Sequence, residues 1–167
     1  MIVQIVPIPA LAFKKVRFYS VFVSGRLNSE FKDFLLRMAK ENKVELAELN
    51  RYIQVIGQKY GALEQHFKNE DAAERLPPPY HQFIETEDPD NYGLRLYCIR
   101  LSPSVVILLN GDRKTTRKVL ECRNCKAHFK FADALAKKIT QAILDGHMGI
   151  DEEEMELWLE EDFEINL

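Results

Sequence analysis

The spacing of apolar residues changes along this chain, and that change limits the folds it can adopt. Between residues 29 and 67 the apolar side chains recur every three or four positions, which is the period of an amphipathic helix. From residue 94 onward they first alternate and then run together in Val105–Leu109, as in strands covered on one or both faces. Helical spacing returns at residues 132–143. The sequence therefore predicts an α+β domain in which a helical hairpin packs on an antiparallel sheet and a terminal helix follows.

The helical region has recognisable ends. Asn28 or Ser29 can cap the first helix, which we expect to end near Asn42. Because only a few residues separate it from the next helix, the two predict an antiparallel hairpin. Before them, the β-branched and aromatic run Val16–Val23 predicts a strand, and IVQIV at the N-terminus is a candidate for another. The second helix has an apolar seam at Leu46, Leu49, Ile53, Ile56, Tyr60, Leu63 and Phe67.

The strand pattern of residues 94–120 predicts a three-strand meander. Ser102–Ser104 is expected to form the first turn and Asn110–Gly111, a strong hairpin signal, the second, so that Lys114–Leu120 becomes the third strand. The preceding stretch, residues 76–91, holds four prolines and predicts a connector with one short extended piece at HQFIE.

Basic side chains gather on the predicted meander. Alternation assigns Leu94, Leu96 and Cys98 to the core face, which leaves Arg95 and Tyr97 together on an open face. Arginine binds phosphate with two hydrogen bonds and an aromatic ring can stack on an unpaired base, so this surface predicts contact with single-stranded RNA. The alternative is an ordinary exposed sheet face whose cations discourage edge pairing. The further RNA-binding candidates are Arg100, Arg113, Arg117 and Lys118, and Lys114 lies among them.

The charge of the chain is divided between a basic body and an acidic end. Residues 149–167 hold nine acids and no Lys or Arg, which leaves residues 1–148 with 23 bases, 17 acids and a net charge of +6. We therefore predict a domain of residues 1–148 and an acidic C-terminal tail. Because apolar residues are interleaved with its acids, the tail is expected to dock on the basic surface of its own chain or of a second copy. The alternatives are a disordered tail and an extra strand on an uncharged part of the body.

Cysteine usage and the first residues of the chain indicate the cytoplasm. An odd number of cysteines, three, gives no complete disulfide framework. Lys14 and Lys15 follow the first apolar run instead of preceding it, unlike the charges of a secretory signal. No apolar stretch approaches the roughly 20 residues that span a bilayer. We therefore expect a cytoplasmic protein with no membrane partner.

The pattern C-x-x-C-x-x-H at Cys122, Cys125 and His128 has the residue types of a zinc site, and Cys98 is a conceivable fourth ligand. The pattern is short, and Cys98 already fits the core alternation, so we expect neither a metal nor another cofactor. A thioredoxin-like redox role also matches C-x-x-C, but no strand leads directly into the pair as that arrangement requires.

The order of the expected elements and the segment YGLRLYCIRLSPSVVILLNGDRKT at residues 92–115 resemble the RelE/HigB-like toxins of bacterial toxin–antitoxin systems. The likeness lies in a strand that carries Leu94-Arg95, a turn, a strongly apolar strand and the basic segment Arg113-Lys114-Thr115. It implies an mRNA interferase, an endoribonuclease whose partners are mRNA, the ribosome and a cognate antitoxin protein.

In that family the implied reaction is attack of a ribose 2′-hydroxyl on the adjacent phosphate of mRNA held in the ribosome. Such a reaction needs a base, an acid and cations that stabilise the charged phosphate. The resemblance implies the cationic role for Arg95 and Lys114. Tyr97 is a candidate for base stacking or proton transfer, and His128 for the acid or base. Two noncatalytic alternatives stay open: a relative that poisons DNA gyrase by protein contact, and an adaptor that binds partners.

Overall fold

The computed structural model describes residues 1–78 and 92–167. Within these ranges the main sheet contains β1 (Ile2–Ala12), β2 (Arg17–Val23), β3 (Lys68–Glu70), β4 (Ala73–Leu76), β5 (Leu94–Ser102), β6 (Val105–Arg113) and β9 (Ile165–Asn166). The α-helices of the same ranges are α1 (Glu30–Glu41), α2 (Lys43–Val55) and α3 (Lys126–Leu144). A separate hairpin is formed by β7 (Met148–Asp151) and β8 (Glu156–Leu159). None of the described helices is both long and apolar enough to cross a membrane.

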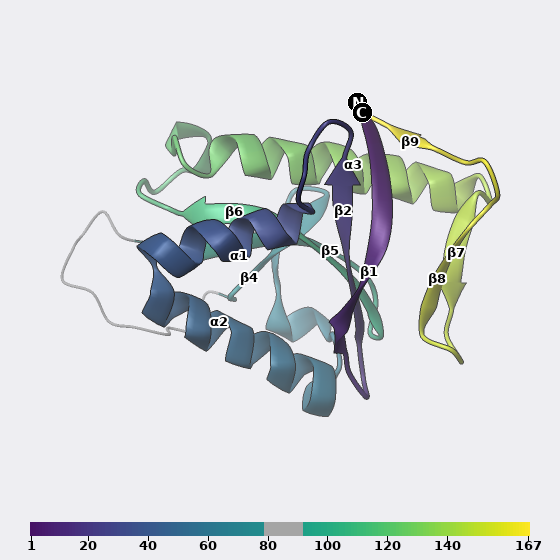
Figure 1. Cartoon of the computed structure of the whole chain (residues 1–167), viewed down its shortest axis with the longest axis horizontal. Helices are drawn as coiled ribbons and strands as arrows, with labels where there is room; N and C mark the ends of the chain where they lie inside the picture. Colours follow the sequence, from purple (N-terminus) through teal and green to yellow (C-terminus); the bar gives the residue numbers. More distant parts are fainter. Residues whose placement is uncertain (79–91) are drawn as a thin grey trace.

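The main sheet lies between two helical layers (Figure 1). Its strand order is β3-β4-β5-β6-β2-β1-β9, and β2 runs parallel to β6 while the other described neighbours are antiparallel. α1 and α2 cover one face over a core that includes Phe18, Phe34 and Leu49. α3 covers the other face over a core that includes Ile107 and Leu135. The predicted α+β class and the helical hairpin on a sheet are thus confirmed, although the sheet is mixed.

The N-terminal half folds largely as its local patterns predict. β2 covers the aromatic and β-branched run, and β1 includes IVQIV. Ser29 caps α1 by accepting a hydrogen bond from Lys32 N at 3.3 Å. The Asn42 N–H closes the helix by donating to Met38 O at 2.7 Å. The buried face of α1 packs against β2 and β6, which anchors the hairpin to the sheet.

α2 is shorter than its apolar seam predicts. A π-helical turn, Ile56–Tyr60, follows Val55, and the chain leaves the helix at Gly61 with φ +80°. That backbone conformation favours glycine and stops a helix. The predicted seam therefore ends before Leu63, which is exposed, and Phe67 leads into β3 instead.

β5 and β6 form an antiparallel hairpin that turns at Pro103, as predicted. The second predicted turn, at Asn110–Gly111, is wrong because β6 continues through it. Between Leu108 and Gly111 β6 carries one residue more than β5, so the Asn-Gly pair belongs to a β-bulge inside the strand. Glycine is required at this bulge because a Cβ would collide with the Arg95 carbonyl.

The predicted third strand of the meander, Lys114–Leu120, is also wrong. Lys114 still exchanges backbone hydrogen bonds with Tyr92 and Gly93, but residues 115–118 belong to no strand and lead into a 3₁₀ turn at Val119–Glu121. The outer neighbour of β5 is β4 instead. The predicted extended piece HQFIE lies outside the described residues.

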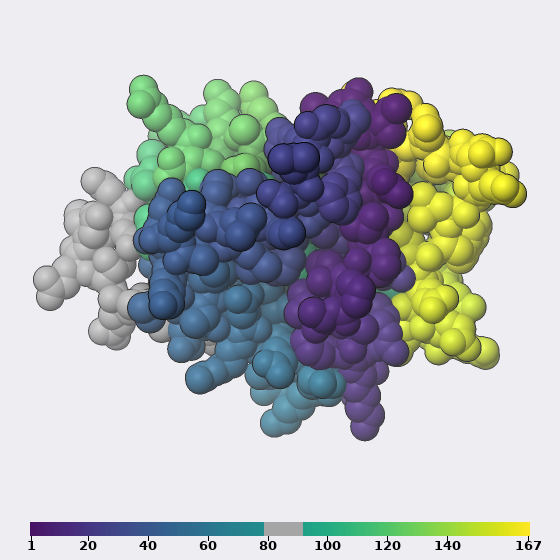
Figure 2. All heavy atoms as spheres, in the orientation of Figure 1, coloured from purple at the N-terminus to yellow at the C-terminus, as the bar shows by residue number. Residues whose placement is uncertain are grey.

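Residues 149–167, the predicted acidic tail, pack against the body as strands. β9 pairs with the start of β1 through Ile165 and Val3, and Leu157 N donates to Tyr19 Oη at 3.0 Å. These segments lie beside β1, on the opposite side of the molecule from the end of β6 (Figure 1, Figure 2). The tail therefore does not dock on the cations beyond β6 in its own chain, and β9 matches the alternative of an extra strand. Docking on a second copy stays a prediction.

Candidate functional site

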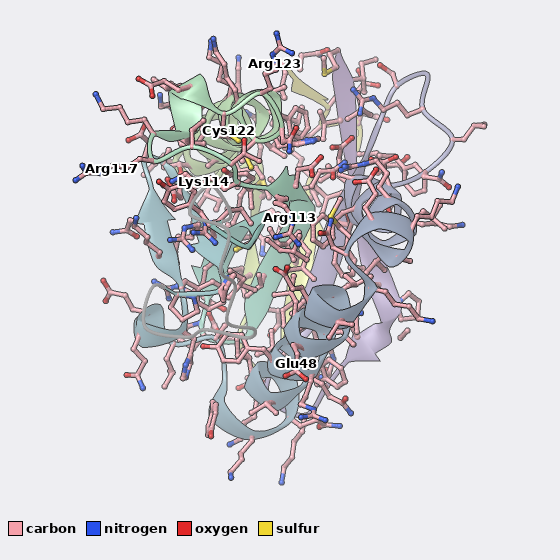
Figure 3. The ribbon with its side chains drawn as sticks, turned by 90° about the vertical axis from the view of Figure 1, so that its left-hand side faces the viewer. Glu48, Arg113, Lys114, Arg117, Cys122 and Arg123 are labelled. Atoms are coloured by element: carbon pink, nitrogen blue, oxygen red, sulfur yellow. The ribbon has the colours of Figure 1, made fainter. Side chains whose placement is uncertain are left out.

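The polar residues of greatest chemical interest lie at one end of the sheet, where β5 begins and β6 ends. β4 and β5 bring Arg75 and Arg95 to this end, and Lys114 follows directly after β6. Figure 3 shows Lys114 beside Cys122, with Glu48 well separated from them on α2. We call Arg75, Arg95 and Lys114 the cationic cluster.

Arg95 is the least satisfied member of the cationic cluster. Its Nη1 donates to Leu94 O at 3.1 Å, but its Nε is buried and has no hydrogen-bond partner among the described residues. Arg75 is only 4% exposed, and its Nε lies 2.8 Å from a carboxylate oxygen of Glu70. Thus one guanidinium is paired, while its neighbour has a buried N–H without an acceptor in the part of the chain that the structure describes.

The members of the cationic cluster repel one another. Burial, and after it the neighbouring Arg75, lower the pKa of Arg95 to about 10. Burial, and after it Arg95, lower the pKa of Lys114, whose Nζ lies 5.9 Å from the centre of the Tyr92 ring. Within the described part of the chain, Glu70 is the carboxylate whose charge raises the pKa of all three cations. Among the described residues, the cluster therefore carries an excess of positive charge that a bound anion would relieve.

A phosphate group suits these donors chemically. Arginine and lysine make short, charge-assisted hydrogen bonds to phosphate oxygens. A buried N–H that has no acceptor in the folded chain gains the most from such a ligand, because its desolvation is already complete. Arg117 and Lys118 are exposed in the segment that follows Lys114, so they extend the positive charge toward solvent. The exposed Arg117 and Lys118 next to the cluster can attract the phosphates of a strand.

Tyr97 does not lie on an open face. It is 1% exposed and packs edge-on against Phe129 of α3, with ring centres 6.1 Å apart. Burial and the neighbouring Cys125 raise the pKa of its hydroxyl far above the ordinary value. Because α3 covers this face of β5, the predicted stacking of Tyr97 on a base is not possible in this arrangement, and the prediction of an open face is wrong.

Two of the predicted RNA-binding arginines are held in other contacts. Arg100, toward the far end of β5, pairs with Glu74 at 3.2 Å. Arg113 Nε donates to Asn42 Oδ1 at 2.7 Å, and Arg113 also pairs with Glu45. These contacts tie β5 to β4 and β6 to the start of α2. The structure therefore assigns both arginines a packing role that sequence alternation did not indicate.

His128, in the first turn of α3, is near the charges of a second polar group at the end of β6. We call Glu30, Asp33, Arg37, Asn110 and Asp112 the α1 network. Arg37 donates to Asp33 and to Asp112, both at 2.9 Å, and Asn110 donates to Glu30 at 3.2 Å. Burial, and after it Arg37, lower the pKa of His128, while Asp112 and Asp33 raise it. The structure thus brings Arg95 and Lys114 together but places His128 with other charges.

The sequence reading missed Arg75 and Glu70 altogether. Glu70 ends β3 and Arg75 lies in β4, and two residues separate these short strands. Nothing in the local spacing of the two residues indicates a functional role. Their importance comes from the pairing of Arg75 with Tyr97 across β4 and β5, which are far apart in the chain. A pattern search limited to neighbouring residues has no signal for such a contact.

The proposed zinc ligands are not assembled. Cys98 lies in the core beneath α1 and α2, whereas Cys122 and Cys125 lie in the core beneath α3, on the other face of the sheet. His128 is engaged with the charges around Arg37. In the part of the chain that the structure describes, no group of three or more His, Cys, Asp or Glu side chains is placed to hold a metal ion.

Comparison with known proteins identifies no relative: no family model, no curated protein and no solved structure matches the chain. The likeness to RelE/HigB toxins therefore rests on residues 92–115, where the structure has the β5–β6 hairpin but not the expected third strand.

Proposed function

We propose that the protein binds single-stranded RNA at the cationic cluster and cleaves it as a ribosome-dependent mRNA interferase of the RelE/HigB type. The observation that carries this proposal is the buried Nε of Arg95, without a partner among the described residues and next to Lys114. Burying like charges together is costly, and such arrangements are concentrated at sites where a ligand supplies the opposite charge. A phosphodiester is the ligand that also suits the exposed Arg117 and Lys118.

The proposed reaction is attack of a ribose 2′-hydroxyl on the adjacent phosphorus, with its proton passing to solvent water, and departure of the 5′ oxygen. Arg95 and Lys114 stabilise the negative charge that builds on the phosphate oxygens. We assign Lys114 to protonate the leaving oxygen, because its lowered pKa makes the ammonium a stronger acid than an ordinary lysine. Neither Tyr97 nor His128 is given a role, since Tyr97 is buried under α3 and His128 faces Arg37.

The test combines binding and cleavage. Affinity for a short fluorescent single-stranded RNA is measured by anisotropy at several salt concentrations, and cleavage of an mRNA on ribosomes is mapped by primer extension. We expect Lys114→Ala to lower cleavage by about 2 to 4 kcal/mol of transition-state stabilisation, as for one well-aimed donor. The slope of log affinity against log salt concentration should become shallower by about 0.7 if one phosphate contact is lost.

Lys138→Ala is the matched control, because Lys138 is exposed near the opposite end of α3. It should keep both RNA affinity and cleavage. Equal activity of Lys114→Ala and Lys138→Ala would remove the proposal. RNA binding by the unmodified protein without any cleavage would retain the phosphate site and favour the noncatalytic alternative, in which the protein acts by contact.

A further inference from the structure

Two of the three cysteines lie together at the start of α3. Cys122 follows the 3₁₀ turn at Val119–Glu121, and Cys125 is the N-cap of the helix. Both are buried in the same core cluster beneath α3, three residues apart in the chain. The third, Cys98, is separated from them by the sheet. The chain therefore holds one pair of neighbouring thiols and one isolated thiol.

The surroundings of the paired thiols differ. Thr115 N lies 3.5 Å and Thr115 Oγ1 3.7 Å from Cys122 Sγ. Burial alone would raise the pKa of Cys122, but these contacts and the backbone N–H groups of Cys125 and Asn124 lower it to about 7. Burial, and after it Cys122, raise the pKa of Cys125 to about 12. One thiol is thus substantially ionised at neutral pH while the other keeps its proton.

This asymmetry is what thiol–disulfide exchange requires. The attacking sulfur must be a thiolate whose pKa lies near the ambient pH, and the second thiol must stay close and protonated until the first has reacted. Cys125 Sγ lies 3.6 Å from Asp112 O, which holds it in place. The N-terminal N–H groups of α3, a helix of 19 residues, favour negative charge at Cys122.

We propose that Cys122 and Cys125 form a reversible dithiol–disulfide pair that exchanges with a small-molecule disulfide such as oxidised glutathione. The Cys122 thiolate attacks one sulfur of the disulfide, whose S–S bond breaks and releases one glutathione thiolate. Cys125 then gives its proton to that thiolate and attacks the Cys122 sulfur, releasing the second glutathione. The two protein thiols are oxidised to a disulfide, and one oxidised glutathione becomes two reduced ones. This inference does not depend on the proposed action on RNA.

Access to Cys122 passes through the segment that follows β6. Residues 115–118 belong to no strand, and the next turn is held by backbone hydrogen bonds from Glu121 N to Lys118 O and from Cys122 N to Val119 O, both 3.1 Å. Segments with so few backbone bonds open locally at low cost. Figure 3 shows Lys114 beside Cys122, with Arg117 and Arg123 extending outward from the same end of the molecule, so the carboxylates of glutathione are attracted to this end.

The experiment uses the full chain, reduced and then incubated with glutathione at a series of reduced-to-oxidised ratios. Samples are quenched with acid, alkylated with N-ethylmaleimide under denaturing conditions and analysed by intact and peptide mass spectrometry. We expect the unmodified protein to lose two of its three thiols and two hydrogens in mass, with Cys122 linked to Cys125 and Cys98 still alkylated. Adding reductant should restore all of them.

Single variants separate the two steps. Cys125→Ser should stop at one glutathione attached to Cys122, whereas Cys122→Ser should lose no thiol. Cys98→Ala is the control and should form the same disulfide as the unmodified protein. Retention of all thiols in oxidised glutathione alone, a link that includes Cys98, or a bond between two chains would each overturn the proposal. The result with the unmodified protein stands even if a variant fails to fold, as checked by circular dichroism.

Discussion

Two groups of polar residues lie at the same end of the sheet and differ in how completely their buried polar atoms are hydrogen-bonded. In the α1 network, Arg37 contacts Asp33 and Asp112, and the buried Asn110 connects them to Glu30. In the cationic cluster, three basic side chains share Glu70 as their carboxylate among the described residues. A network whose buried polar atoms are hydrogen-bonded stabilises a fold, whereas buried cations that outnumber their carboxylates are costly unless a ligand offsets them.

The contrast gives the two groups opposite expected responses to mutation. Removing a member of the α1 network leaves a buried partner without its hydrogen bond and destabilises the protein. Removing Arg95 or Lys114 from the cationic cluster relieves repulsion and costs function instead of stability. Sites built for ligands commonly show this exchange of stability for activity.

The largest effect is expected for Asn110→Ala. The amide donates to Glu30 at 3.2 Å and to Asp33 at 2.9 Å, and Glu30 is only 4% exposed. Its loss leaves a buried carboxylate short of a donor, so we expect the free energy of unfolding to fall by about 3 kcal/mol. Urea unfolding followed by circular dichroism measures it. Asn50→Ala, on the exposed side of α2, is the control and should stay within about 0.5 kcal/mol of the unmodified protein.

A smaller effect of opposite sign is expected for Arg95→Met. Methionine keeps the apolar part of the side chain and removes the positive charge that repels Arg75 and Lys114. The free energy of unfolding should stay the same or rise by up to about 2 kcal/mol, while RNA affinity falls. Arg37→Met is the matched variant in the α1 network and should lose stability. If both arginine variants are destabilised alike, the distinction between the two groups does not hold.

Sequence patterns predicted correctly the helices and strands that are determined by neighbouring residues. The capping residue Ser29 and the apolar stripe after it define α1, and the aromatic run defines β2. The Asn110–Gly111 pair failed as a turn signal because its role depends on a partner far away in the chain. Asn110 is held by Glu30 and Asp33 of α1, and the glycine allows the close approach of Arg95, so a bulge forms where a turn was expected.

The sequence predicted only part of the site, because some of its contacts lie within one hairpin and others join separate segments of the chain. Arg95 and Lys114 flank the β5–β6 hairpin, so strand pairing alone brings them to one end of the sheet. Tyr97 was assigned to an open face because alternation distinguishes two faces without showing what covers each. Only the packing of α3 decides that its ring meets Phe129. Arg75 joins the site through β4, a contact between strands that are distant in sequence.

The smallest expected effect concerns the pH dependence of stability at His128. Burial, and after it Arg37, hold the pKa of His128 below its ordinary value of 6.5, against the opposing charges of Asp112 and Asp33. In the unfolded chain this histidine takes up a proton as the pH falls through 6.5, while in the folded protein it does so only at lower pH. The unfolded state then binds more protons, so the free energy of unfolding decreases as the pH falls below 6.5, and above that pH His128 has no such effect.

His128→Gln should therefore show a shallower loss of stability than the unmodified protein between about pH 7.5 and pH 5.5, a range above the titration of ordinary carboxyl groups. Urea unfolding at closely spaced pH values measures the slope. His66→Gln is an independent comparison, because burial also lowers the pKa of His66, which lies far from the α1 network beside Tyr52 and Tyr60. The double variant should show the sum of the two reductions. An unchanged slope in His128→Gln would mean that His128 has the same pKa in the folded and the unfolded chain, so that neither burial nor Arg37 shifts it.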